Sequence, residues 1–230
     1  MALKLTVFAA AAGFALAAST AEARNILITN DDGLTSNVVA LYVALRAEGH
    51  DVVVSVPCVN QSGQGAALGI ARPIAPLKEA CLNDAAQPGA PGAGPMTRAG
   101  LPEGDFYYGD GTPVAALLHG LDVPTLQRQR HWLDAAVMGI PAIALSAGAN
   151  SEGASLDNPL SDEVARRSVE LLAKLDSKAN GSALLPAGLA LNVNFPDKLE
   201  GAVWELTEVG SYNAYKVGFT TNMAANASPM

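Results

Sequence analysis

Asn-Ile-Leu-Ile-Thr-Asn-Asp-Asp-Gly, residues 25–33, is the stretch of sequence that decides the fold. Its first five residues form a short apolar run, which predicts a buried strand. Residues 36–48 then show apolar positions at helical spacing, and residues 51–56 predict a second buried strand. This order predicts a βαβ unit with parallel strands and a right-handed crossover.

The rest of the chain continues this alternation. Thr112 followed by Pro113 is typical of a helix start, and Pro-, Gly- and Ala-rich residues 83–104 predict a surface connection without a core element. We expect further strands at 105–108, 141–146, 188–195 and 203–209, and further helices from 113, at 126–138 and at 161–175. The predicted fold is therefore a three-layer α/β fold with a mostly parallel, Rossmann-like sheet.

The N-terminus has the pattern of a secretory signal peptide. Lys4 precedes an apolar run at residues 5–18, and Ala21-Glu22-Ala23 fits the cleavage pattern. A membrane anchor and a buried helix are the alternatives, but the run is shorter than the roughly 20 residues that span a bilayer. We therefore expect a signal peptide at 1–23, one domain at 24–230, a periplasmic or secreted location, and no membrane attachment after cleavage.

The charge balance restricts the partners. The chain has 14 Lys and Arg against 22 Asp and Glu, a formal net charge of −8, and no basic patch. We therefore expect no binding to a nucleic acid polymer. An acidic protein that binds an anion needs a local cation, which a bound metal supplies.

The two cysteines, Cys58 and Cys81, are either a disulfide or two buried thiols. Export to an oxidising compartment and the even count favour the disulfide. It would close a loop of roughly 22 residues and stabilise the fold by about 3 kcal/mol.

Asp31 and Asp32 are the first candidates for chemistry. Ligands of open α/β sheets bind at the carboxyl ends of the strands, where this pair lies. Two adjacent carboxylates repel each other, and a hard divalent cation offsets that repulsion. The alternative is an Asp-rich turn that bonds only its own backbone.

Other polar groups follow at the same predicted edge. Ser62 offers a hydroxyl oxygen to the metal, while Asn30, Asn60, the backbone at Gly63 and the helix start at Thr112 are candidates for substrate binding. An ordinary turn and an ordinary helix cap are the alternatives for these loops. None of the three histidines has metal-ligand spacing, and His50 is expected at the surface.

The order of these motifs resembles the SurE family of survival-protein nucleotidases, in its secreted branch. The resemblance is carried by Asn30-Asp31-Asp32-Gly33, Asn60-Gln61-Ser62-Gly63, Gly111-Thr112-Pro113 and the Gly139–Ser146 stretch. It implies a metal-dependent acid phosphatase that acts on nucleoside monophosphates. It also implies that Asp31, Asp32 and Ser62 are metal ligands.

The sequence departs from the family between Pro113 and Gly139. The family's fourth ligand is an Asn in a Ser-Gly-x-Asn-x-Gly-x-Asn loop that follows a central strand, and this interval contains no such loop. About one strand, one loop and part of a helix are missing. Asn150 is a weak candidate to replace this fourth metal ligand. Without the central strand, its neighbours lack a hydrogen-bonding partner, so they close up, lose stability or assemble with a second copy.

We therefore expect a phosphomonoesterase that uses Mg²⁺ or Mn²⁺, with Asp31 and Asp32 as its catalytic pair. The first alternative is an exported relative that binds metal or nucleotide without catalysis. The second is a receiver-like signalling domain, which also begins with an acidic pair. That class needs a phospho-accepting Asp and a strand-end Lys, and Asp110 is a poor match for the former.

Overall fold

The structure is a computed structural model that describes residues 23–69, 73–127, 142–147, 151–186 and 188–207. The chain divides into two units, Met1–Asp197 and Lys198–Met230, and all named helices and strands lie in the first. Among the described residues, no helix has the length and apolarity to cross a membrane.

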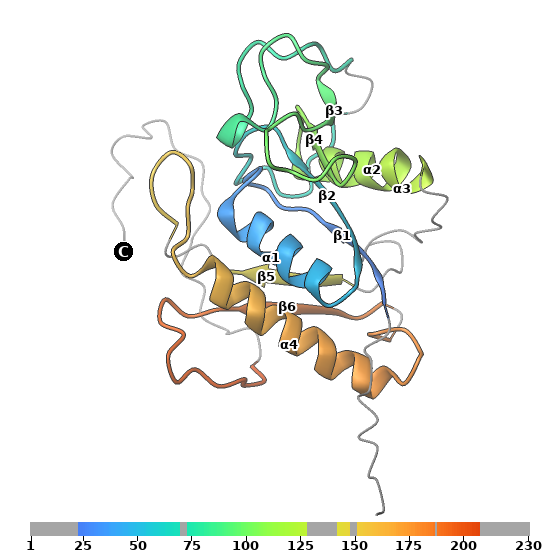
Figure 1. The fold of residues 1–230 in the computed structure, drawn as a ribbon, viewed down its shortest axis with the longest axis vertical. Coiled ribbons are helices and arrows are strands. Elements are labelled where there is room, and N and C mark those ends of the chain that lie inside the picture. The colour runs from blue at the N-terminus through green and yellow to red at the C-terminus, as the bar shows by residue number, and fades with distance from the viewer. Residues whose placement is uncertain (1–22, 70–72, 128–141, 148–150, 187, 208–230) are drawn as a thin grey trace, which may run out of the picture. The chain divides into compact units, whose positions relative to one another are not determined.

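The predicted βαβ unit is confirmed (Figure 1). Strand β1 (Asn25–Ile28) pairs in parallel with β2 (Asp51–Pro57), and helix α1 (Ser36–Ala47) connects them. Thr35 caps α1, because its side chain accepts a hydrogen bond from the Val38 N–H. Every residue of β2 after Asp51 is buried, as expected of a central parallel strand.

Two further strands extend this sheet. Strand β4 (Phe106–Gly109) runs parallel to β2, and β3 (Ala93–Pro95) pairs antiparallel with β4, so the strand order is β1-β2-β4-β3. Because β1, β2 and β4 are parallel, their carboxyl ends share one edge of the sheet. The connections that follow these ends carry all of the predicted site residues.

Helices cover both faces of this sheet. On one face, Tyr42 of α1 lies against Phe106 of β4, with ring centroids 4.5 Å apart. On the other face, α2 (Pro113–Asp122) packs so closely that a Cβ at Gly120 would lie 2.7 Å from the Ser55 Cβ. Ser55 also donates a buried hydrogen bond of 2.7 Å to the Ala116 carbonyl. The three predicted layers are therefore present.

Two strands form a separate sheet. Strand β5 (Ala142–Ser146) pairs in parallel with β6 (Ala190–Asn194), and helix α4 (Ser161–Ala179) packs against α1. Within the described residues, β1 pairs only with β2 and β5 only with β6. The flanking strands have thus not closed up across the missing segment, and the apolar strand β5 is half-buried to exposed.

Two expectations from the sequence are wrong. The 83–104 connection does contribute to the core, since Ala85 and Ala86 are buried beside the short 3₁₀ helix η1 (Leu82–Asp84). Residues 203–207 form no strand in the described chain, and Leu206 is 97% exposed, while residues 208 and 209 of the predicted strand lie outside the described residues. Helix α3 (Pro124–Gln127) covers only the start of the predicted 126–138 helix, and residues 128–138 lie outside the described chain.

Candidate functional site

The acidic pair sits in a turn that is held from within. Asn30 closes it twice: its Oδ1 accepts from the Gly33 N–H (3.0 Å), and its Nδ2 donates to the Gly33 carbonyl (2.8 Å). Asn30 therefore shapes the turn with both of its polar atoms, although the sequence suggested substrate binding. The turn leaves Asp31 exposed and Asp32 half-buried at the carboxyl edge of the sheet.

Gly33 is required by this turn for two reasons. Its φ of +98° belongs to the left-handed region that favours glycine. A Cβ at this position would also lie 3.0 Å from the Pro57 carbonyl oxygen at the end of β2. The acidic turn can therefore lie directly against the neighbouring strand.

The loop after β2 reaches back to the acidic pair. Ser62 Oγ donates to Asp32 Oδ1 at 2.9 Å, and the Gln61 N–H donates to the Asp31 carbonyl at 2.6 Å. Asn60 Oδ1 accepts from the Ser62 N–H (2.7 Å), which sets the turn that presents Ser62. Gly63 follows with a φ of +90°. The structure thus brings together the three residues that the sequence assigned to one metal.

Thr112 takes the helix-capping position that the sequence predicted. Its hydroxyl accepts from the Ala115 N–H (3.3 Å) at the start of α2, just beyond the end of β4. No hydrogen bond links Thr112 to the acidic pair within the described residues. Its placement at the same sheet edge still puts the N–H groups and positive dipole end of α2 on the side where ligands bind.

Two residues at the site had not been assigned a role from the sequence. The main-chain N–H of Gln61 contacts the acidic turn, as described above. Asn83 of η1 donates from Nδ2 to the Leu34 carbonyl (2.8 Å) and to the Ser155 carbonyl (2.9 Å), so it braces the chain just after Gly33. Asn83 has a positive φ of 52°, and no spacing pattern relates it to residue 34.

The donor set fits a hard divalent cation in its chemistry. Two carboxylates and one hydroxyl are oxygen ligands of the kind that Mg²⁺ and Mn²⁺ accept, and water can fill the remaining positions. The hydrogen bond from Ser62 to Asp32 places two of these oxygens within reach of one ion. Among the described residues, no group of three or more His, Cys, Asp and Glu side chains is placed to hold a metal ion. Asn150 lies outside the described residues.

His50 is not at the surface, contrary to the expectation from the sequence. It is 4% exposed and accepts a hydrogen bond at Nδ1 from the Arg24 N–H (3.2 Å). Burial lowers the pKa of His50, although the nearby carboxylates of Asp176 and Glu48 oppose that shift. Its position at the start of β2, away from the carboxyl edge, gives it a structural role.

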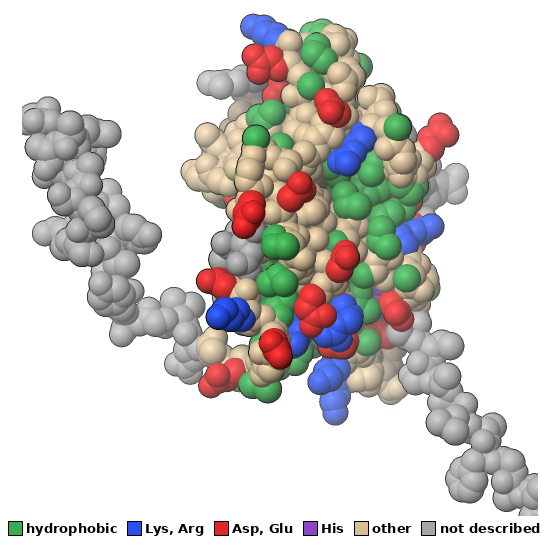
Figure 2. Space-filling view, turned by 60° about the vertical axis from the view of Figure 1, so that its left-hand side comes forward, with side chains coloured by type: hydrophobic (Ala, Val, Ile, Leu, Met, Phe, Trp, Pro, Cys, Tyr) green, Lys and Arg blue, Asp and Glu red, His purple; other side chains and the backbone are tan. Residues whose placement is uncertain are grey.

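The surface charge is mixed. Acidic and basic side chains are interspersed on the face shown in Figure 2. Arg166 and Arg167, for example, both bind Glu163 within α4.

Fold and site together define a class: an open α/β protein with a cluster of carboxylate and hydroxyl side chains at the carboxyl edge of its sheet. The family model described as Survival protein SurE matches residues 26–132 and 131–216. The chain belongs to the SurE family.

Individual relatives agree with this assignment. The chain is 26% identical over 208 residues to the 5'-nucleotidase SurE of Thermosipho melanesiensis, covering 80% of this chain and 70% of that protein. It is 28% identical to an acid phosphatase of Yarrowia lipolytica, over 74% of this chain and 56% of that one. It is 30% identical to the 5'-nucleotidase SurE 1 of Thermus thermophilus, over 74% of this chain and 66% of that protein. The chain thus spans only part of each relative's length.

The family match also locates the departure from the family pattern. The family model matches the chain in two segments, and these segments meet at residues 131–132. This junction lies inside the Pro113–Gly139 interval, which lacks the Ser-Gly-x-Asn loop. In the chain, β4 precedes this interval and β5 follows it, and these two strands belong to separate sheets.

Proposed function

We propose that this protein is a divalent-metal-dependent phosphomonoesterase that hydrolyses nucleoside monophosphates. The observation that carries the proposal is the hydrogen bond of 2.9 Å between Ser62 Oγ and Asp32 Oδ1, which joins residues 30 positions apart at the carboxyl edge of the sheet. The names of the relatives, 5'-nucleotidase and acid phosphatase, support the reaction class.

The side chains have distinct roles in this proposal. Asp31 and Asp32 hold the cation, Mg²⁺ or Mn²⁺, and the Ser62 hydroxyl completes one side of its shell. The bound cation supplies Lewis-acid polarisation of the phosphoryl oxygens. Asn30 and Asn60 fix the two turns, and the N–H groups near Gly63 and at the α2 start after Thr112 face the phosphate.

We also propose that residues 1–23 are a signal peptide and that the protein works in the periplasm or outside the cell. The disulfide between Cys58 and Cys81 supports this location, because such bonds persist in oxidising compartments.

The proposal is tested by phosphate release from nucleoside 5'- and 3'-monophosphates with added Mg²⁺ or Mn²⁺. We expect Asp32→Asn to lower kcat/KM by on the order of 100-fold or more, because it removes an anionic ligand. Glu103→Gln, a matched change at an exposed carboxylate, should leave turnover unchanged. Equal turnover by wild type and Asp32→Asn would contradict the assignment.

A binding protein without catalysis is the second candidate, favoured by the absence of the Ser-Gly-x-Asn loop between Pro113 and Gly139. Calorimetry with Mn²⁺ and a non-hydrolysable nucleoside monophosphate, run beside the activity assay, separates the two. Binding of both ligands by a protein that releases no phosphate would favour this candidate.

A further inference from the structure

The loop that carries Ser62 has little support of its own. It leaves β2 at Cys58 and returns to the body of the protein at Leu77 and Cys81. Between Val59 and Pro76 the described residues form no helix or strand, and all except Gln61 are exposed. Its hydrogen bonds to the acidic turn are the two short contacts made by Gln61 and Ser62.

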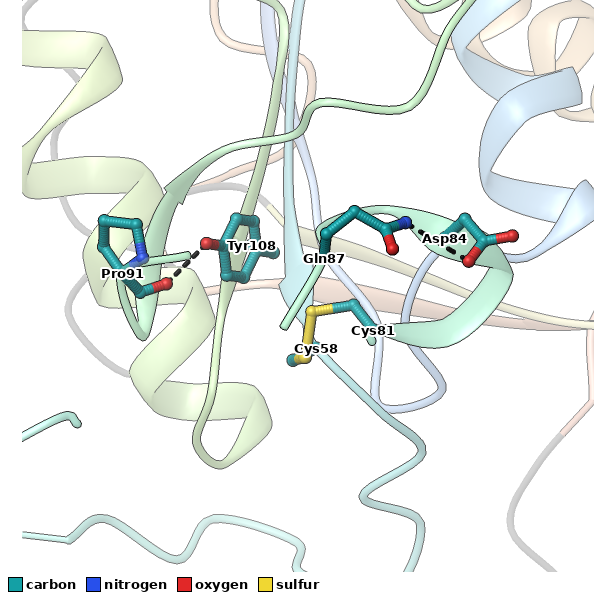
Figure 3. The surroundings of a disulfide bond; sticks show 6 residues. All are labelled: Cys58, Cys81, Asp84, Gln87, Pro91 and Tyr108. Atoms are coloured by element: carbon teal, nitrogen blue, oxygen red, sulfur yellow. Dashed lines mark hydrogen bonds between the residues drawn. A yellow bond between two sulfur atoms is a disulfide. The ribbon is translucent and has the colours of Figure 1, made fainter. Parts of the chain in front are cut away.

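The disulfide between Cys58 and Cys81 closes the base of this loop (Figure 3). Both cysteines are buried, at 4% and 3% exposure, within the main hydrophobic core. The Cys58 N–H donates to the Gly109 carbonyl at the end of β4 (2.9 Å). The loop therefore starts from a fixed point only four residues before Ser62.

The Cys81 end is also fixed to the body of the protein. The Cys81 N–H donates to the Ala86 carbonyl (2.9 Å), and the Leu82 N–H donates to the Cys58 carbonyl (2.8 Å). Asn83, two residues beyond Cys81, braces the acidic turn through the Leu34 carbonyl. The same short segment thus holds the turn that carries Asp31 and Asp32 and, through the disulfide, the base of the loop that carries Ser62.

We propose that the Cys58–Cys81 disulfide is a positioning element for the metal site, and that it acts by holding Ser62 and the Gln61 N–H against the acidic turn. The metal part of this inference rests on the proposed function, whereas the loop part does not. Removal of the bridge frees the loop and weakens the cation site without removing any of its ligands. Outer-shell contacts of this kind alter metal affinity by about 10- to 100-fold.

The first measurement needs no metal. Hydrogen exchange is followed at the Gln61 amide in wild type and in Cys58→Ala/Cys81→Ala. We expect Gln61 to exchange at least about 10-fold faster in the variant, while the Val54 amide in the core of β2, bonded to the Asp105 carbonyl at 2.8 Å, stays unchanged. Fast exchange at Val54 as well would show that the variant has unfolded. The measurement is then repeated with Cys58→Val/Cys81→Ala, because valine fills more of the space that the disulfide leaves.

The second measurement is Mn²⁺ affinity in a double-mutant cycle. Loss of the bridge should weaken Mn²⁺ binding by about 10-fold in the wild-type background. In a Ser62→Ala background the same loss should have less than about a 2-fold effect, because the metal ligand that the bridge positions is gone and only the Gln61 N–H contact remains. If the bridge had a purely structural role, its loss would weaken Mn²⁺ binding by the same factor in both backgrounds. Leu172→Ala, a core change in α4, controls for general destabilisation.

The outcomes are separable. Unchanged Gln61 exchange in a folded variant without the bridge overturns the proposal, and so does an equal effect on Mn²⁺ affinity in both backgrounds. If wild type binds no Mn²⁺, the proposed function fails, and the exchange of Gln61 alone decides whether the bridge positions the loop.

Discussion

Ser62 Oγ lies 2.9 Å from Asp32 Oδ1 and donates a hydrogen bond to it. The contact joins the loop after β2 to the turn after β1, two neighbouring parallel strands whose carboxyl ends share one edge. A hydroxyl that bonds a carboxylate in this way can turn its lone pairs to a cation that the same carboxylate binds.

Gly33→Ala should destabilise the protein by about 1–3 kcal/mol, because it adds left-handed strain and a contact with the Pro57 carbonyl oxygen. Gly100→Ala is the matched control: its φ of +86° carries similar strain, but a Cβ there meets no atom within 4 Å. Urea unfolding of both variants measures the difference. Equal losses would show that the contact with Pro57 costs nothing.

Stability should fall as the pH drops below about 6.5, the usual pKa of histidine. Burial lowers the pKa of His50 and of His119 in the folded protein, so the unfolded chain binds protons first. The two histidines therefore contribute fully to the free energy of unfolding when the pH is above their pKa in the unfolded chain. This contribution is lost as the pH falls toward their lower pKa in the folded protein. Urea unfolding at pH 7.5 and 5.5 should show a smaller loss for His50→Gln than for wild type. An identical loss in both proteins would rule out His50 as a source.

Asp176→Asn should cost about 1–3 kcal/mol, because it removes a charged acceptor from a largely buried contact. Arg24 Nε donates to Asp176 Oδ1 at 2.7 Å, and the two side chains are 19% and 10% exposed. The pair ties the start of β1 to α4. Glu170→Gln breaks an exposed pair with Arg166 within α4 and should change the unfolding midpoint little. Comparable midpoints for Asp176→Asn and wild type would contradict this.

The protein should self-associate, because its strands form two separate sheets with unpaired edges within the described chain. Strands β1 and β5 each lie at the edge of a sheet within the described chain, and edge strands readily pair with another copy. Sedimentation velocity should show association that rises with concentration. Ala144→Lys, a charge on exposed β5, should reduce it. A monomer at all concentrations would show that these edges do not pair between molecules.

Local pattern was sufficient to predict much of the fold. The apolar run at residues 25–29, the helical spacing that begins near Val38 and the Thr112-Pro113 start signal each depend on neighbours in the chain, and each element is present. The disulfide was also expected, from its cysteine count and the export signal. The site residues could be placed at one edge because parallel strands end together.

The remaining features depend on partners that are distant in the chain. Neither the burial of Ala86 within the Pro- and Gly-rich connection nor the contact of Asn83 with Leu34 leaves a periodic signal in the sequence. His50 looks like a turn residue after Gly49, but the Arg24 N–H needs an acceptor there. Val203 and Leu206 fit a strand pattern, yet a strand also requires a neighbour with free hydrogen-bonding groups.

The most direct test of the cation site is a calorimetric titration of Mn²⁺ into the metal-free protein. Wild type and Glu103→Gln should bind Mn²⁺ equally. Asp31→Asn/Asp32→Asn should bind it at least about 100-fold more weakly, since the two anionic ligands are gone. Mn²⁺ binding by the double variant with wild-type affinity would contradict the assignment of the acidic turn as the metal site.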